Sequence, residues 1–471
     1  MFLFLIMQNF WTYDDNGKVK INQSKLISFL ADSGFSKVKV SNTNFLLVHE
    51  KNNRVSEIED TVVIDYVSTY LKKVNNEDVL EAFSKGVSGY INKTKLKLLP
   101  STELVNDRDG DITSHFFFQN ICCQVGDNKI KEIEYENFKN RIWESRILEN
   151  KYISSIVGKS QFEKFCYNLA GKNNDRLLAL QTNIGCLLHR NNDPKNSKAL
   201  IFIDENISYD GTANGGTGKS LLLQAVGKCR ELVVIDGKNI KTNSWFKNQR
   251  IKITTDVVFY DDVTIKFSLE ELYSMITTGI SIERKHKDEI YIKPEDAPKI
   301  AISSNYVVRG TGGNTDIRRR CEFEVANHYD AKNTPFDEFK SRFFHDWDDK
   351  EWSSFFQFMM NCVLKYFEHG LIIAKPINLK RNKLISLTCI EFVTFIETGI
   401  IENEKWESKK TTLELFVDEY PHLNNTSSHK FTKWMKAYAK DHDLEYEDRK
   451  SGSKYQFYLK PKNLRKEASN D

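Results

Sequence analysis

The stretch ALIFIDENISYDGTANGGTGKSLLLQAVGK, residues 199–228, decides the fold. An apolar run comes first, a glycine-rich segment follows, and an apolar helix start ends it. The segment closes on G-K-S, like the pattern G-x-x-x-x-G-K-[ST] of phosphate-binding loops. Ala213 stands where that pattern has its first glycine, and a positive φ costs alanine more than glycine. An ordinary glycine-rich turn is the alternative.

The loop supplies the groups that a nucleotide needs. Glycines let backbone N–H groups close around phosphate oxygens. Lys219 is expected to neutralise charge on the β- and γ-phosphates, and the Ser220 hydroxyl to ligate Mg²⁺. ATP and Mg²⁺ are therefore the expected cofactors. The predicted nucleotide-binding residues are Asn214, Gly215, Gly216, Thr217, Gly218, Lys219 and Ser220.

Compact apolar runs precede and follow this loop and alternate with amphipathic segments. Such runs are typical of strands buried on both faces of a parallel sheet. They lie at residues 199–205, 232–236, 257–262 and 299–305. The pattern predicts an α/β P-loop NTPase core.

Two of these runs end in polar residues with catalytic potential. VVFYDD ends in Asp261 and Asp262, of which Asp261 is expected to hold Mg²⁺ and Asp262 to act as general base. KIAISSN ends in Asn305, whose amide can orient the attacking water. The alternatives are a solvated acidic turn and an ordinary strand end.

Two basic segments complete the set. ISIERKHKDEIYIK, residues 280–293, predicts a hairpin with a basic tip that could contact a nucleic-acid backbone. DIRRRCEFEV carries Arg318, Arg319 and Arg320, whose planar donor forks fit a phosphoryl transition state. The alternatives are a solvated hairpin tip and a structural salt-bridge cluster.

The order of these motifs along the chain resembles that of the superfamily 3 helicases. The hairpin and the following S-S-N are similar to the DNA-binding hairpin and sensor motif of papillomavirus replicative helicases. The loop N-G-G-T-G-K-S is similar to that of primase-associated helicases of phages, plasmids and integrated elements, including the poxvirus primase–helicase group. The likeness runs from about Ser160 through Tyr329 to Ile373 and fades at both ends.

The resemblance implies an AAA+-like ring that hydrolyses ATP and translocates on single-stranded or forked DNA. The expected protein is a homo-hexamer encoded by a phage or mobile element and acting in the bacterial cytoplasm. A primase or other replication proteins are its further candidate partners. The implied catalytic residues are Lys219, Asp261, Asp262, Asn305 and Arg319, with Ser220 and Asp261 at the metal and Lys285, His286 and Lys287 on DNA. Arg319 is favoured as the finger among the three arginines.

Composition sets broad limits. The 471 residues suffice for two to four domains. A net charge of +3 means that any basic surface must be local. Eight cysteines without a C-x-x-C pair indicate thiols in a reducing compartment. The apolar start MFLFLIMQNF is too short to span a bilayer, so no membrane partner is expected.

Three domains are predicted: an N-terminal α+β accessory domain over residues 1–155, the ATPase with a helical lid over 156–375, and a winged-helix-like domain over 376–471. Residues 134–149 are predicted as a helical connector. NDRDGD, residues 106–111, is interpreted as a loop rather than a primase or calcium site. In the tail, Lys450, Lys454 and the segment 430–440 could meet DNA, or the module could serve subunit contacts.

Two rival functions remain open. A non-helicase AAA+ NTPase would share the loop and the acidic strand without needing the basic hairpin. A replication initiator or origin-binding ATPase would use its turnover for assembly and origin melting.

Overall fold

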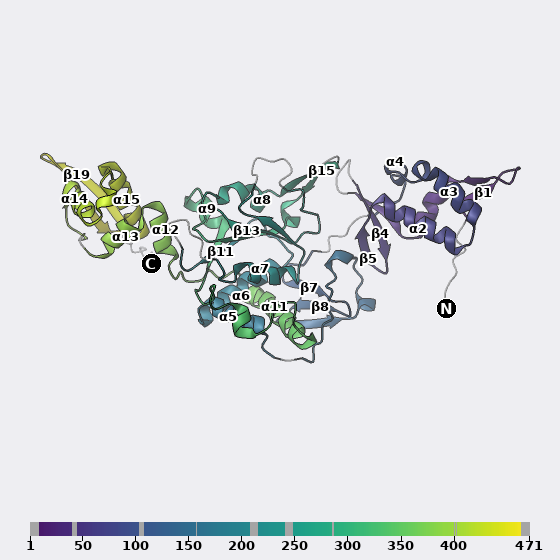
Figure 1. The fold of residues 1–471 in the computed structure, drawn as a ribbon, viewed down its shortest axis with the longest axis horizontal. Helices are drawn as coiled ribbons and strands as arrows, with labels where there is room; N and C mark the ends of the chain where they lie inside the picture. The colour runs from purple at the N-terminus through teal and green to yellow at the C-terminus, as the bar shows by residue number, and fades with distance from the viewer. Residues whose placement is uncertain are drawn as a thin grey trace, which may run out of the picture.

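The computed structural model describes residues 9–39, 45–102, 108–156, 158–207, 215–240, 248–284, 287–399, 401 and 403–462. Figure 1 shows three parts in a row along the longest axis, with the N-terminal part at one end, a large central part and the C-terminal part at the other end. The chain is a mixed α/β protein, and its central part contains a parallel sheet.

The central sheet has five strands in the order β12-β13-β16-β11-β17, all parallel. Their bounds are β11 Ala199–Asp204, β12 Leu232–Asp236, β13 Val257–Val263, β16 Lys299–Ser304 and β17 Arg320–Val325. The four apolar runs predicted as buried strands are confirmed, each within one residue at either end. β16 lies between β11 and β13, so the strand before the glycine-rich loop and the strand with the two aspartates are not neighbours.

Both faces of this sheet are covered, as the continuous apolar runs predict. Successive side chains of a strand point to opposite faces. Leu200 and Phe202 of β11 enter one core, whereas Ala199 and Ile201 enter the other. The first core includes α5 (Gln161–Leu169), α6 (Asn174–Leu188), α7 (Lys219–Gly227) and α11 (Asp349–His369). The second includes α8 (Tyr273–Thr277) and the hairpin of β14 (Ile280–Arg284) and β15 (Lys287–Ile292).

The helix predicted as a lid, α11, is a core element. Phe355, Met359 and Val363 are fully buried, and α11 packs along α6 (Figure 1). The segment before the sheet forms the helices α5 and α6. The two helices are separated by a turn, and Asn173 starts the second by accepting a hydrogen bond from the backbone N–H of Arg176. The remaining short elements of the central part are η3 Leu269–Leu272, η4 Pro294–Asp296, α9 Gly313–Arg319 and α10 Pro335–Phe339.

The N-terminal part has its own core, built from helices against a five-stranded sheet of order β10-β5-β4-β3-β6 and a small hairpin, β1-β2. Its helices are α1 Gln23–Asp32, α2 Asp60–Lys73, α3 Glu77–Tyr90 and α4 Lys93–Leu96. Its strands are β1 Trp11–Tyr13, β2 Val19–Ile21, β3 Phe35–Lys39, β4 Phe45–Lys51, β5 Arg54–Glu57, β6 Ser101–Thr102 and β10 Ile142–Trp143.

A three-stranded sheet joins the central part. Its strands are β7 Thr113–Phe117, β8 Cys122–Gly126 and β9 Lys129–Ile133. Phe116 and Val125 from this sheet share one hydrophobic core with Phe162 of α5 and Phe356 of α11. The packing therefore does not follow the boundary predicted at residue 155, because these strands pack with the segments that come after it.

The prediction of a helical connector over residues 134–149 is wrong. This segment contains η1 (Tyr135–Asn137), the short strand β10 and η2 (Glu144–Arg146). The backbone N–H of Ile142 donates to the carbonyl of Asn53 at 2.9 Å, and β10 pairs with β5. Ile142 and Trp143 are buried at this edge, so sheet pairing and burial override the local helix pattern.

The C-terminal part encloses a separate core. Its elements are α12 Leu379–Leu387, α13 Ile390–Glu397, β18 Glu407–Ser408, α14 Lys409–Glu419, η5 Pro421–Leu423, α15 Ser428–Asp441, β19 Leu444–Ser451 and β20 Lys454–Pro461. The three strands form a sheet of order β18-β20-β19. Across the described ranges, no helix combines the length and apolar composition needed to cross a bilayer.

Candidate active site

Four of the five predicted catalytic residues converge at the carboxyl edge of the parallel sheet, and Arg319 does not. Lys219 begins α7, just after the loop that follows β11, while Asp261 and Asp262 lie near the carboxyl end of β13. Asn305 directly follows β16, the strand between them. Parallel strands end at one edge, so three distant stretches of sequence bring their polar ends together there.

Lys219 is buried among three acceptors. Its Nζ donates to Oδ1 of Asp204 at 2.5 Å, to Oδ1 of Asn305 at 2.9 Å and to Oγ1 of Thr217 at 3.2 Å. An ammonium group has three donors, so each has a partner here. Thr217 also donates from its hydroxyl to Asp204, at 2.6 Å. The loop lysine is thus held at the sheet edge by side chains from two strands.

Two glycines in the described part of the loop adopt a left-handed backbone conformation. Gly216 and Gly218 have φ of +100° and +99°, a region that side chains other than glycine rarely adopt. A Cβ on Gly218 would lie 2.8 Å from Cζ of Phe165, so α5 packs directly against the start of α7. Ala213 and Asn214 lie outside the described residues, and their roles remain predictions.

Ser220 and Asp261 meet beside the lysine. The Ser220 hydroxyl donates to Oδ1 of Asp261 at 2.9 Å, and the Ser303 hydroxyl of β16 donates to the same oxygen at 2.7 Å. Mg²⁺ takes hard oxygen ligands and is usually held by one or two carboxylates plus water and substrate phosphates. A hydroxyl and a carboxylate side by side fit this ion. The described residues contain no group of three or more His, Cys, Asp or Glu side chains that could hold a metal alone.

A bulge in β13 explains why two consecutive carboxylates lie together at the sheet edge. In a regular strand Asp261 and Asp262 would point to opposite faces. The register with β16 shifts between Tyr260 and Val263, and Asp262 has φ of +55°. The bulge re-aims both side chains toward the sheet edge. Gly237 fits closely here, because a Cβ at that position would lie 2.5 Å from the carbonyl oxygen of Asp261.

Asp262 has partners on both sides. Nδ2 of Asn305 donates to its Oδ1 at 2.7 Å, and Nζ of Lys238 lies 2.6 Å from its Oδ2. The bond to Asp262 raises the pKa of Lys238. Asn305 therefore contacts both the loop lysine and the second aspartate.

The basic hairpin is anchored on the opposite face of the sheet from α6 and α11. Four isoleucines hold it in the second core; they are Ile280, Ile282, Ile290 and Ile292. The strands β14 and β15 are antiparallel, and their register shifts near the tip. Lys285 and His286 lie outside the described residues, as does the side chain of Lys287. DNA contact by these residues remains a prediction.

The arginines lie at the other edge of the sheet. Arg320 pairs with Ala199, the first residue of β11, whereas Lys219 follows the last. Five residues of strand span about 17 Å, so this site and the arginines of one chain do not meet. Arg320 is structural, because it pairs with Asp316 and Glu322 at 3.0 Å each.

The other two arginines differ in exposure. Arg319 is half-buried, donates to the carbonyl of Thr315 at 3.0 Å and lies over the ring of Tyr273. Arg318 is exposed, and within the described part of the chain its side chain has no ion pair. Both belong to α9, at the opposite edge of the sheet from their own loop, so a finger role for either would have to act on another subunit.

Sequence reasoning missed three residues of the site: Asp204, Ser303 and Lys238. Asp204 ends the run IFID and could have been noticed as the first acid after a buried strand. Ser303 belongs to an alternating strand whose hydroxyl direction depends on the neighbouring bulge. Lys238 belongs to no sequence motif that indicates a functional site.

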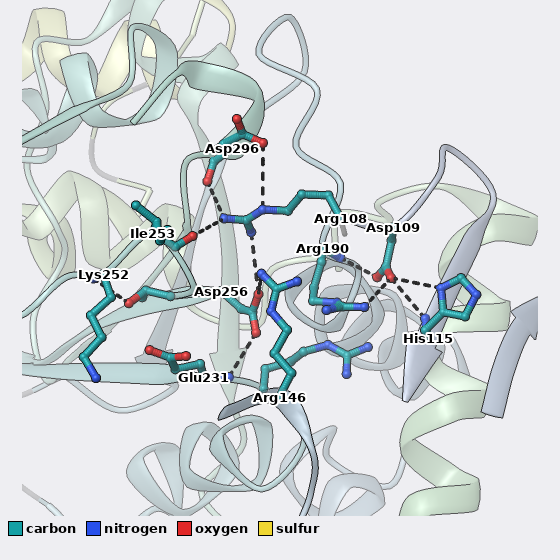
Figure 2. A network of polar contacts seen from close by, with 12 residues as sticks. Arg108, Asp109, His115, Arg146, Arg190, Glu231, Lys252, Ile253, Asp256 and Asp296 are labelled. Atoms are coloured by element: carbon teal, nitrogen blue, oxygen red, sulfur yellow. Dashed lines mark hydrogen bonds and ion pairs between the residues drawn. The ribbon is translucent and has the colours of Figure 1, made fainter. Parts of the chain in front are cut away.

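A second polar cluster lies at the amino edge of the sheet (Figure 2). Arg108 donates to the carbonyl of Asp296 at 2.6 Å and to the carbonyl of Ile253 at 3.1 Å, and its Nη1 lies 3.6 Å from Asp256. Asp256 immediately precedes β13, and Asp296 ends η4 after the hairpin. Arg108 thereby ties the segment before β7 to the bases of both the acidic strand and the hairpin.

Asp109 is the structural centre of the NDRDGD segment. Its side chain is fully buried and accepts from the hydroxyl of Ser114 at 2.6 Å and from Nη2 of Arg190 at 2.9 Å. Burial alone would raise the pKa of Asp109, but the charge of Arg190 and the bonds from His115 and Ser114 hold it well below its usual value. This residue is a buried structural acid within a loop. Asn106 and Asp107 lie outside the described residues.

No protein-family model matches the chain, and no curated protein matches it. Among solved structures, the A form apo structure of the NrS-1 C-terminal region covers 93% of this chain and 99% of that one, at 14% identity and a TM-score of 0.44. A second structure of that region, residues 305–718, covers 74% and 96%, at 14% identity and a TM-score of 0.33. TM-scores below 0.5 do not establish a common fold, so these are similarities only.

Proposed function

We propose that the chain is an ATP-dependent DNA helicase of the superfamily 3 type, which translocates on single-stranded DNA as a ring. One observation carries the proposal. Lys219, Asn305 and Asp262 form a continuous hydrogen-bonded chain, with Ser220 bound to Asp261 beside it. These residues come from three motifs whose order along the sequence resembles that family.

Each residue of the site has a proposed role in ATP binding or hydrolysis. Lys219 would place its charge on the β- and γ-phosphates of ATP, and the backbone of Gly216 and Gly218 would cradle them. Ser220 and Asp261 would hold Mg²⁺, which neutralises charge on the transferring phosphoryl group. Asp262 would accept a proton from the attacking water. Asn305, in contact with Lys219 and Asp262, would report phosphate occupancy to both.

The basic hairpin is anchored on one face of the same sheet. This arrangement supports a coupling of ATP turnover to movement on DNA. Asn305 follows β16, and η4, which leads into β16, follows the hairpin strand β15. A shift at the sheet edge therefore has a short covalent path to the hairpin. The basic tip at Lys285 and His286 would track the DNA backbone in a homo-hexamer.

The test is strand displacement on forked DNA with ATP and Mg²⁺. The full chain is expected to displace the strand, and Lys219→Ala to lose both displacement and ATP turnover. Turnover retained by Lys219→Ala would place the nucleotide site elsewhere. Turnover without displacement by the unmodified chain would favour a non-helicase NTPase. Binding confined to one origin sequence, with melting but no processive unwinding, would favour an initiator.

A double variant tests the hairpin. Lys285→Ala with His286→Ala is expected to abolish displacement while basal ATP turnover stays largely intact, because neither residue is among those proposed to bind the nucleotide. Lys293→Ala, an exposed lysine just after β15, is the matched control and should displace normally. Displacement that survives the double variant would overturn the role of the tip.

A further inference from the structure

One face of α15 in the C-terminal part is a stripe of basic residues. His429, Lys433, Lys436 and Lys440 are spaced by four, three and four residues, so they lie on one side of the helix. All four are exposed. The helix contains no glutamate, and its one aspartate, Asp441, is its last residue. We call these four residues the α15 stripe.

The opposite face of α15 fixes the orientation of the stripe. Phe431, Trp434, Met435 and Ala439 are buried in the C-terminal core, together with Phe457 of β20. Because this apolar face is fully engaged, the stripe is directed away from the part to which it belongs. The helix has 14 residues and is therefore about 21 Å long.

The hairpin of β19 and β20 extends the basic surface. Its tip is exposed and carries Arg449, Lys450 and Lys454 around Gly452, which has φ of +63°. Lys436 of the stripe lies over the ring of Tyr446 in β19, 5.2 Å from its centroid, so stripe and hairpin adjoin. In Figure 1 this hairpin projects from the free end of the C-terminal part.

The acids of the hairpin do not cancel this charge. Glu445 and Glu447 pair with Lys460, and Asp448 pairs with Lys409 at 2.8 Å. Within the described part of the chain, no ion pair involves Lys433, Lys436, Lys440, Lys450 or Lys454. The local charge therefore remains positive, although the whole chain carries only +3.

The shape and composition of this surface select duplex DNA among polyanions. The major groove of B-DNA admits an α-helix, whereas the major groove of A-form RNA is too narrow and deep for side chains to read. Single-strand binding uses aromatic platforms for bases. The α15 stripe contains no Phe, Tyr or Trp, since Phe431 and Trp434 are buried on the other side of the helix, and the ring of the exposed Tyr455 on the hairpin lies under Nζ of Lys450.

We infer that the C-terminal part binds B-form duplex DNA, with α15 in the major groove and the β19–β20 hairpin on the adjacent backbone. This site is separate from the nucleotide site, and the inference goes beyond the proposed function. It gives the protein a binding site for the duplex in addition to any contact with the single strand.

The experiment is a binding titration of the full chain without nucleotide. The probe is a labelled DNA duplex of about two helical turns, or ~21 base pairs, compared with its single strand and with an RNA duplex of the same sequence. The variant Lys433→Ala/Lys436→Ala/Lys440→Ala is expected to bind the DNA duplex at least about tenfold more weakly at about 0.1 M salt. Its slope of log K against log salt should fall by about 2.7, or about 0.9 for each lost phosphate contact.

The matched control is Lys72→Ala/Lys73→Ala/Lys85→Ala, which removes three exposed lysines from the N-terminal part. It should retain duplex binding. Helical circular dichroism and basal ATP turnover of the stripe variant should equal those of the unmodified chain. Equal weakening by both triple variants would mean that only net charge matters, and would overturn the inference.

Three further outcomes would also overturn it: no duplex binding by the unmodified chain, preference of the stripe for the single strand or RNA duplex, and competition by poly-glutamate as effective as competition by duplex DNA. Failure of the proposed function is recognised separately. It would appear as absent ATP turnover or absent displacement, while binding is measured without nucleotide.

Discussion

Nζ of Lys219 lies 2.5 Å from Oδ1 of Asp204, and both side chains are buried. The remaining two donors of the ammonium group are bound to Thr217 and Asn305. A phosphate oxygen can therefore reach Lys219 only by replacing one of these acceptors. Asp204 is the acceptor that carries a negative charge, so it is the group in direct competition with a nucleotide.

Asp204→Asn tests this competition. The change removes a carboxylate from beside the phosphates but keeps an acceptor for Lys219. We expect ATP to bind about three- to tenfold more tightly, which corresponds to about 1 kcal/mol. Thermal unfolding without nucleotide should occur at a lower temperature, because a buried lysine loses its counter-charge. Titration with a fluorescent ATP analogue and thermal melting measure the two effects.

Asp236→Asn is the control for that experiment. Asp236 ends the neighbouring strand β12, but it is exposed and accepts from Asn239 and from the backbone of Lys238. Its replacement should leave ATP affinity unchanged. Weaker ATP binding by Asp204→Asn would contradict the competition and would give Asp204 a supporting role in the site.

Asp262→Asn separates binding from hydrolysis. If Asp262 is the general base, the amide should lower ATP turnover by about 10²- to 10⁴-fold while ATP affinity stays within a few-fold. Lys238→Ala removes the exposed partner of the same carboxylate, and exposed ion pairs contribute little, so its melting temperature should be unchanged. Single-turnover hydrolysis and equilibrium binding distinguish the two steps. A normal hydrolysis rate in Asp262→Asn would assign the base to another residue.

The parallel sheet was predictable because its strands are continuous apolar runs buried on both faces. β12 agrees with its predicted range residue for residue. The polar ends of the runs were also predictable as candidates, since parallel strands end together. The individual contacts were not predictable. The oxygen atoms that accept from Lys219 depend on the path of the loop, and the direction of the Asp262 side chain depends on a bulge of one residue. Neither leaves a periodic trace in sequence.

The error at residues 134–149 has a different cause. Local spacing favoured a helix, but Ile142 and Trp143 found partners in β5, more than 80 residues earlier in the chain. Long-range pairing of this kind is invisible to a local pattern. The same holds for β7–β9, whose apolar side chains fit the core of the central part even though the chain reaches them before the predicted boundary.

Asp109→Asn should destabilise the central part at neutral pH. The substitution leaves the guanidinium of Arg190, whose side chain is 1% exposed, without its buried carboxylate, a loss that costs about 3–5 kcal/mol. The depressed pKa of Asp109 means that its contribution is complete above the unfolded-state value of about 3.9 and is lost as pH falls through the folded-state pKa. The difference in melting temperature between variant and unmodified chain should therefore shrink in acid. Asp111→Asn, at an exposed neighbour, should melt normally.

Arg320 pairs with Ala199, about 17 Å along β11 from the strand end that holds Lys219, and Arg318 and Arg319 directly precede Arg320, so any part that they take in hydrolysis must involve the site of another subunit. One of the two variants Arg318→Ala and Arg319→Ala is expected to remove the arginine finger. That variant should keep ATP affinity but lower ATP turnover of the assembled protein by about 10³-fold or more. Mixing that variant with Lys219→Ala subunits should restore turnover above that of either alone, because each supplies the group that the other lacks. Arg320→Ala should instead lower the melting temperature through its lost pairs with Asp316 and Glu322. Failure of every mixture to regain turnover would confine the active site to residues of a single subunit.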